Sequence, residues 1–223
     1  MTFYVDLIPS AWHWFCWPVL IFSLFYATWS FPLRSVLAVP LRQHLILGSA
    51  IALLLTWKIA ANLKGLDFEL HLFGMTAVVM LIGSGPALIA GALALILQTL
   101  ISTAIGWAAF AVNFVIGVLL PTAISAACIG LISRLPQKNL FAYMLGAGFA
   151  GAIATRLVTT LLIYLLWHNS GDISLADTAD VYLPWMLLIS FPEGFVNGMV
   201  ITAITVYLPH WMRSFDEQRY LGK

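Results

Sequence analysis

Charged residues are scarce in this sequence. Lysine, arginine, aspartate and glutamate together make up 9% of its 223 residues, whereas 62% are hydrophobic. So little polar sequence cannot cover the surface of a water-soluble globule, which excludes that class of protein. We therefore expect one integral membrane domain over residues 1–223, with the lipid bilayer as its surroundings and with no nucleic-acid partner.

Metal-type cysteine spacing and nucleotide-binding motifs are also lacking. The two cysteines, Cys16 and Cys128, lie in apolar runs, so we interpret them as small buried hydrophobic residues. No Gly-x-x-x-x-Gly-Lys-Ser/Thr segment occurs, so the chain cannot hydrolyse ATP itself. To pump a substrate against a gradient, it would need ATPase subunits and a coupling membrane subunit as partners.

Apolar runs fill most of the chain, and most of them reach the roughly 20 residues that a membrane-spanning helix needs. The third run is short, and Gly83-Ser84-Gly85-Pro86 separates it from the fourth. This pair predicts either two helices joined by a tight turn or one broken, partly re-entrant element. The pattern as a whole predicts an all-α polytopic protein of about seven transmembrane helices. The runs cover about 10–31, 43–61, 70–83, 86–106, 113–133, 140–167 and 183–208.

Basic residues are distributed unequally between the two sides of the predicted membrane domain. Seven fall in loops and the tail on one side, namely Arg34, Arg42, Arg134, Lys138, Arg213, Arg219 and Lys223. Only Lys58 and Lys64 fall on the other side. Because cytoplasmic loops are enriched in lysine and arginine, we expect the N-terminus outside and the C-terminus inside, in the cytoplasmic (inner) membrane of a prokaryote.

Most acidic residues fall on the predicted outer side. They are Asp6, Asp67, Glu69, Asp172, Asp177 and Asp180. An acidic outer rim would concentrate cations at the entrance of a site there. The alternative is that these side chains only solvate the loops.

Two charges lie well inside apolar runs. Glu193 is in the last run and Arg156 is in the run before it. A charged group in hydrocarbon costs several kcal/mol unless it is paired or lies in a polar cavity, so we expect these two to form a structural ion pair. The alternative is direct contact of Glu193 with a substrate. Ser190 lies three residues before Glu193, but no histidine shares their depth, so we do not expect an enzyme.

A second set of polar groups converges on the predicted outer side. His71 opens the third run, Asn113 opens the fifth, and Asp6 and the amino terminus precede the first. An imidazole, an amine and amide groups suit a late first-row divalent metal. No His-x-x-x-His or Cys-x-x-Cys pair supports a metal site, and His71 taken alone could be an interfacial histidine bonded to water or a carbonyl group.

Several short motifs together resemble the CbiM/NikM family, the substrate-capturing membrane components of group I energy-coupling factor transporters for cobalt and nickel. The resemblance covers nearly the whole chain. The motifs are Leu7-Ile8-Pro9 before a Trp-rich first helix, a loop histidine before Gly74, Gly85-Pro86, Asn113 with Pro121 downstream, and Phe191-Pro192-Glu193-Gly194.

The resemblance implies a seven-helix protein that captures a divalent metal ion near its outer face and releases it inward. The implied ligands are His71 and the amino terminus of Met1 or Thr2, with Asp6 and Asn113 as alternative or supporting groups. The family has a histidine at position two, where this chain has Thr2, so it resembles a divergent member. The resemblance implies that nickel or cobalt is the transported substrate, with other late first-row metals as alternatives. We expect no tightly bound cofactor.

A role other than transport stays open as an alternative. The missing second-position histidine and the polar tail over 213–221 would also fit a membrane assembly or sensory partner built on the same scaffold.

Overall fold

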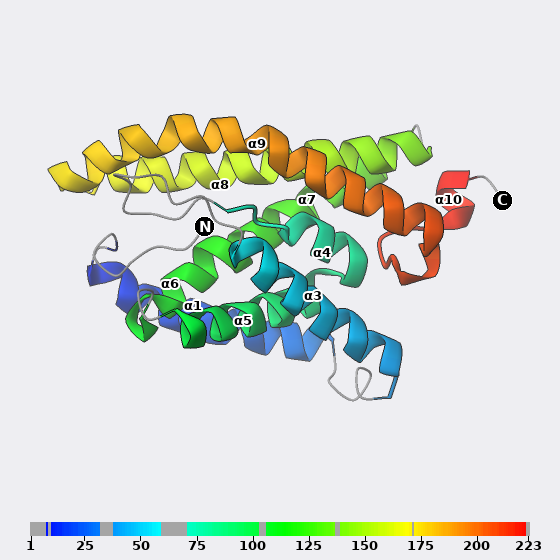
Figure 1. Cartoon of the computed structure of the whole chain (residues 1–223), viewed down its shortest axis with the longest axis horizontal. Coiled ribbons are helices and arrows are strands. Elements are labelled where there is room, and N and C mark those ends of the chain that lie inside the picture. Colours follow the sequence, from blue (N-terminus) through cyan, green and yellow to red (C-terminus); the bar gives the residue numbers. More distant parts are fainter. Residues whose placement is uncertain are drawn as a thin grey trace.

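The computed structural model describes residues 8, 10–31, 38–58, 71–102, 106–136, 139–170 and 172–221. Across these ranges the chain is helical and contains no strand, which confirms the predicted all-α class (Figure 1). The first four helices are α1 (Ser10–Ser30), α3 (Pro40–Lys58), α4 (Met75–Ile82) and α5 (Ser84–Ile101).

Three long helical segments make up the second half. The first consists of η2 (Trp107–Ala109), α6 (Phe110–Phe114), η3 (Val115–Leu119) and α7 (Leu120–Arg134). The second joins η4 (Ala142–Ala150) to α8 (Gly151–His168), and the third is α9 (Ile173–Tyr207). The short η5 (Pro209–Trp211) and α10 (Glu217–Leu221) follow.

Four of the described segments are long and apolar enough to cross a membrane by length and composition. They are Ser84–Ile101, Trp107–Arg134, Ala142–His168 and Ile173–Tyr207. Helix α4 has 8 residues, which at 1.5 Å per residue gives a length of roughly 12 Å, too short to cross alone. The sequence left open whether Gly83-Ser84-Gly85-Pro86 joins two helices or interrupts one broken element. The structure has two helices: α4 ends at Ile82, Gly83 has a φ of +84°, and α5 begins at Ser84.

Two boundaries differ from the sequence prediction. The third run was expected to be helical from about residue 70, but residues 71–74 are not helical and α4 begins at Met75. The last helix begins at Ile173, about ten residues before the expected start, because the Asp172 carboxylate accepts hydrogen bonds from the backbone nitrogens of Ser174 and Leu175. Asp177 and Asp180, expected in a loop, therefore lie within the first turns of α9.

Small residues allow α8 and α9 to lie side by side along much of their length (Figure 1). A Cβ atom added at Gly194 would lie only 2.5 Å from Cγ1 of Ile153, so the close approach of the two helices requires glycine there. This pair forms one layer, and α1, α3 and α5 lie on the opposite side of the bundle.

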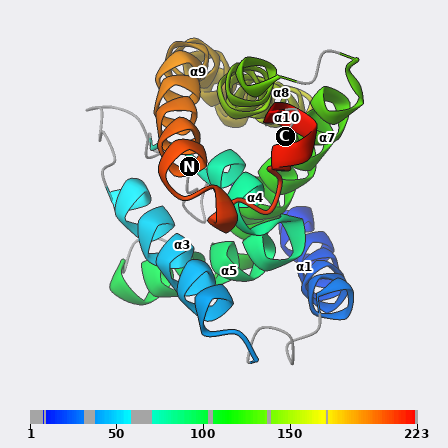
Figure 2. The same ribbon diagram turned by 90° about the vertical axis from the view of Figure 1, so that its right-hand side faces the viewer.

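Helix α4 is at the centre of the bundle. It packs on α5, α7 and α9, and seen from the end of the molecule it lies between α3 and α9 (Figure 2). Six of its eight residues are buried. A helix this short is not stable alone, so its stability depends on the residues around it, including those that contact its two ends.

Candidate functional site

The two charges inside the bundle meet. Arg156 of α8 and Glu193 of α9 form an ion pair in which Nη2 lies 3.1 Å from Oε2, and the two side chains are 0% and 2% exposed. Breaking a pair this deeply buried would leave one charge without compensation. The structure therefore places the two predicted partners in direct contact.

The carboxylate of Glu193 also binds the backbone ahead of α4. Its Oε2 accepts a hydrogen bond of 2.7 Å from the nitrogen of Phe73, and its Oε1 accepts one of 3.0 Å from the nitrogen of Gly74. Gly74 adopts the left-handed conformation, with φ of +69°, and so turns the chain from this segment into α4. Sequence reasoning missed this contact, since backbone groups leave no trace in a side-chain pattern, although Gly74 was a signal that the backbone turns there.

Asn197 lies one helical turn after Glu193 and completes the same arrangement. Its Oδ1 accepts from the nitrogen of Ala77 at 3.0 Å, while its Nδ2 donates to the carbonyl oxygen and to Oε1 of Glu193, at 2.8 and 2.9 Å. Gly74, at the N-cap position of α4, has no side chain to cap the helix. The amide and carboxylate of α9 supply the cap instead, and the negative charge of the carboxylate suits the N-terminal end of a helix dipole.

Arg156 fixes the other side of the non-helical segment 71–74. Its Nη2 donates to the carbonyl oxygen of His71 at 2.6 Å, and its guanidinium carbon lies 3.8 Å from the centre of the Phe73 ring. From α3, Nε1 of Trp57 donates to the carbonyl oxygen of Phe73 at 3.1 Å. Three helices, α3, α8 and α9, therefore position the four residues that lead into α4.

His71 is held within this framework and is 4% exposed. Its Nδ1 lies 3.0 Å from the carbonyl oxygen of Leu72, and its ring packs beside that of Trp57, with 5.7 Å between the centres. A carbonyl group can only accept, so Nδ1 carries the proton and Nε2 carries the lone pair. The ring is buried inside the bundle, where a neutral imidazole is favoured over a charged one, and the neutral form is the one that binds a metal.

The remaining predicted metal ligands are spread over the chain. Asn113 is buried in α6, a helix that packs on α1 and α5. Met1, Thr2 and Asp6 lie outside the described residues. Within the described ranges, no group of three or more His, Cys, Asp or Glu side chains is arranged to hold a metal ion.

Comparison with known proteins gives a family match. A family model described as "Cobalt uptake substrate-specific transmembrane region" matches residues 5–211. No protein of curated function matches the sequence.

Two solved structures share the fold. A crystal structure described as a transition metal transporter has a TM-score of 0.69 and 18% identity, with 94% of this chain and 93% of that chain covered. A structure described as a truncated transition metal transporter has a TM-score of 0.70 and 18% identity, with 96% and 100% covered. At this level of identity the likeness shows the fold alone.

Proposed function

The chain belongs to the CbiM family, and from this premise we propose that it captures a divalent transition-metal ion on the outer side of the membrane and releases it inward. Membership makes the protein a membrane component of metal uptake, in a family of transporter components rather than enzymes. More specifically, we propose that the protein is the substrate-binding component of an energy-coupling factor type transporter and that the ion is nickel or cobalt.

One observation carries this proposal. Side chains of three separate helices hold segment 71–74, which contains His71, and that imidazole is buried. A histidine whose Nδ1 donates to a carbonyl group has the tautomer in which Nε2 can bind a metal. The ion pair of Arg156 and Glu193 then serves to hold the ligand segment rather than to contact the ion.

The proposed ligand set is His71 together with the amino terminus of Met1 or Thr2, with Asp6 and Asn113 as further or supporting oxygen groups. Because Thr2 replaces the second-position histidine of the family, this site has one imidazole fewer. Nitrogen ligands favour nickel and cobalt over harder cations, so the loss should weaken binding without favouring calcium or magnesium.

The direction and energy of transport follow from the charge pattern and the missing nucleotide motif. We place the N-terminus outside and the C-terminus inside the cytoplasmic membrane of a prokaryote, since seven basic residues lie on one side and two on the other. Without a phosphate-binding loop of its own, the protein would accumulate metal only with ATPase and coupling membrane subunits.

The test is metal binding by the purified full chain. After loading with Ni²⁺ or Co²⁺ and removal of excess ion, elemental analysis should give about one metal per chain, and His71→Ala should abolish saturable binding in calorimetry. His168→Ala is the matched control, because His168 is an exposed histidine at the end of α8. Unchanged binding by His71→Ala would overturn the ligand assignment.

A second candidate is a membrane assembly or sensory partner on the same scaffold. It is favoured by Thr2 and by the lack of a metal-holding group of side chains within the described ranges. In the same experiment, the absence of any stoichiometric metal after loading would favour this role over capture.

A further inference from the structure

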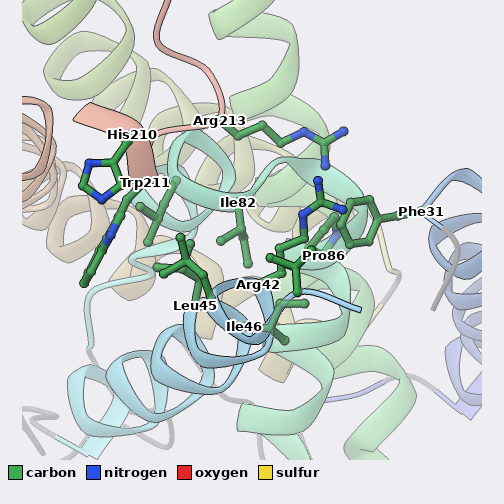
Figure 3. Close-up of a pocket in the computed structure, with 12 residues that line it drawn as sticks. Phe31, Arg42, Leu45, Ile46, Ile82, Pro86, His210, Trp211 and Arg213 are labelled. Atoms are coloured by element: carbon green, nitrogen blue, oxygen red, sulfur yellow. The ribbon is translucent and has the colours of Figure 1, made fainter. Parts of the chain in front are cut away.

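A basic cavity opens at the end of the bundle where α3 begins and α9 ends (Figure 3). Its volume is about 360 Å³, and its lining includes Arg42 of α3, His210 and Trp211 of η5, Arg213 and Phe31. None of the described residues that line it is acidic. Helix ends of membrane-spanning segments lie at the bilayer surface, so this cavity is at the level of lipid headgroups.

Two guanidinium groups converge beside one aromatic ring in this cavity. The guanidinium carbons of Arg42 and Arg213 lie 5.8 and 5.1 Å from the centre of the Phe31 ring, and Figure 3 shows both groups pointing toward the same space. Two guanidinium groups that face one space can together bind a phosphate group through charge-assisted hydrogen bonds.

The backbone holds Arg213 in this position. Its nitrogen donates to the carbonyl oxygen of Leu81 at 2.9 Å, and the nitrogen and Oγ of Ser214 donate to that of Met80, at 3.2 and 2.7 Å. These bonds satisfy carbonyl groups at the C-terminal end of α4. The Arg213 side chain passes so close to Gly83 that a Cβ atom there would lie 2.9 Å from its Cδ. The cavity is thus built by the fold and does not arise from loose surface side chains.

An apolar groove continues from the cavity along the bundle. It has a volume of about 510 Å³ and lies between α3, α4 and α9. Both spaces are lined by Leu41, Leu45, Leu81 and Trp211. Along α3 the groove is lined from Leu41 to Thr56, which at 1.5 Å per residue is roughly 22 Å and exceeds the roughly 15 Å depth of one leaflet of the hydrocarbon core.

We propose that the cavity and the groove together form a site for an anionic phospholipid. The phosphate lies between Arg42 and Arg213, one acyl chain lies in the groove, and Trp211 marks the boundary between the two. Basic pockets between transmembrane helices recognise anionic headgroups in this way, and the continuous apolar groove distinguishes a lipid from free phosphate. The groove reaches Leu72 and Gly74 but is not lined by His71, and the proposal does not depend on metal capture.

Native mass spectrometry of the purified full chain, released from detergent with added phosphatidylglycerol, tests the headgroup contact. We expect one retained lipid, with affinity about fivefold lower in Arg213→Gln or Arg42→Gln and about 25-fold lower in the double variant. Arg134→Gln, which changes an exposed arginine at the end of α7 outside the cavity, should bind as the original chain does.

A groove variant tests the acyl contact independently of charge. Gly48 lines the groove, and a Cβ atom added there would meet nothing within 4 Å, so Gly48→Leu places a bulky side chain at the groove from a position with open space. Gly130→Leu is the matched control, because Gly130 on α7 also has open space around it and does not line the groove. We expect Gly48→Leu to lower phosphatidylglycerol retention at least fivefold and Gly130→Leu to leave it unchanged.

Three results would overturn the proposal. Equal retention of phosphatidylglycerol by the double arginine variant would remove the headgroup site. Equal binding of inorganic phosphate in competition, with no effect of Gly48→Leu, would make it a free-anion site. Retention of zwitterionic phosphatidylcholine as strong as that of phosphatidylglycerol would show that only the apolar groove binds.

Discussion

The carboxylate of Glu193 lies 3.0 Å from the backbone nitrogen of Gly74, a residue 119 positions earlier in the chain. This contact lets one buried acid do two things: it neutralises Arg156, and it caps the N-terminal end of α4. The ion pair and the backbone hydrogen bonds therefore hold the same carboxylate, one from α8 and the other from the start of α4. The last helix is thereby linked to the segment that carries His71.

Removing the acid should therefore destabilise the protein strongly. Glu193→Ala leaves the Arg156 charge buried and two backbone N–H groups without their acceptor, so we expect a loss of about 3–5 kcal/mol in the free energy of unfolding. Thermal unfolding in detergent, followed by the reaction of buried Cys16 with a thiol-specific dye, measures this change. Glu217→Ala removes an exposed acid and should have no effect. A Glu193→Ala variant as stable as the original chain would show that the pair is dispensable.

Gly74 should tolerate no side chain. Its φ of +69° is strained for any L-residue, by roughly 1–2 kcal/mol, and an added Cβ would lie 3.2 Å from Cδ2 of Leu53. We expect Gly74→Ala to lower the unfolding temperature in the same dye assay. Gly130→Ala is the control, because this helical glycine has open space around it and alanine there should raise stability by up to about 1 kcal/mol. If Gly74→Ala were neutral, the left-handed turn would not be needed to bring the backbone to Glu193.

Asn197 should protect the first turn of α4 specifically. Asn197→Ala leaves the nitrogen of Ala77 without its acceptor, which costs about 1–3 kcal/mol when the group is buried. Hydrogen exchange followed by mass spectrometry should show faster exchange in peptides covering the start of α4, with α5 unchanged. Gln218→Ala, an exposed amide in α10, should alter neither peptide. Unchanged exchange at the start of α4 in Asn197→Ala would mean that Glu193 alone suffices as the cap.

Much of the fold could be predicted from the sequence. The all-α membrane class and the family resemblance are confirmed, because long apolar runs and short motifs are local features that survive in any single sequence. The contact of Arg156 with Glu193 followed from the cost of charge in hydrocarbon, since the sequence has no other charged residue well inside an apolar run.

The contacts that the sequence did not reveal are those made by backbone groups and by local helix ends. Phe73 continues an apolar run, so nothing in its side chain shows that its backbone is not helical and that its nitrogen bonds to Glu193 of α9. Asp172 is a good N-cap residue, but the polar residues after it concealed the early start of α9. The amino-terminal ligands Met1, Thr2 and Asp6 stay predictions, because they lie outside the described residues.

The Arg156→Lys variant distinguishes two roles of Arg156: stabilising the fold and positioning His71, the proposed metal ligand. A lysine ammonium can still pair with Glu193, but it cannot also reproduce the planar contact with the Phe73 ring or the bond to the carbonyl oxygen of His71. Groups that orient a metal-binding histidine are typically worth about 10–100-fold in metal affinity. We therefore expect Arg156→Lys to fold, to keep an unfolding temperature well above that of Glu193→Ala, and to bind Ni²⁺ or Co²⁺ at least about tenfold more weakly in calorimetry. Arg134→Lys provides the exposed control. Full metal affinity in a folded Arg156→Lys variant would show that the guanidinium supports the bundle but not the position of His71.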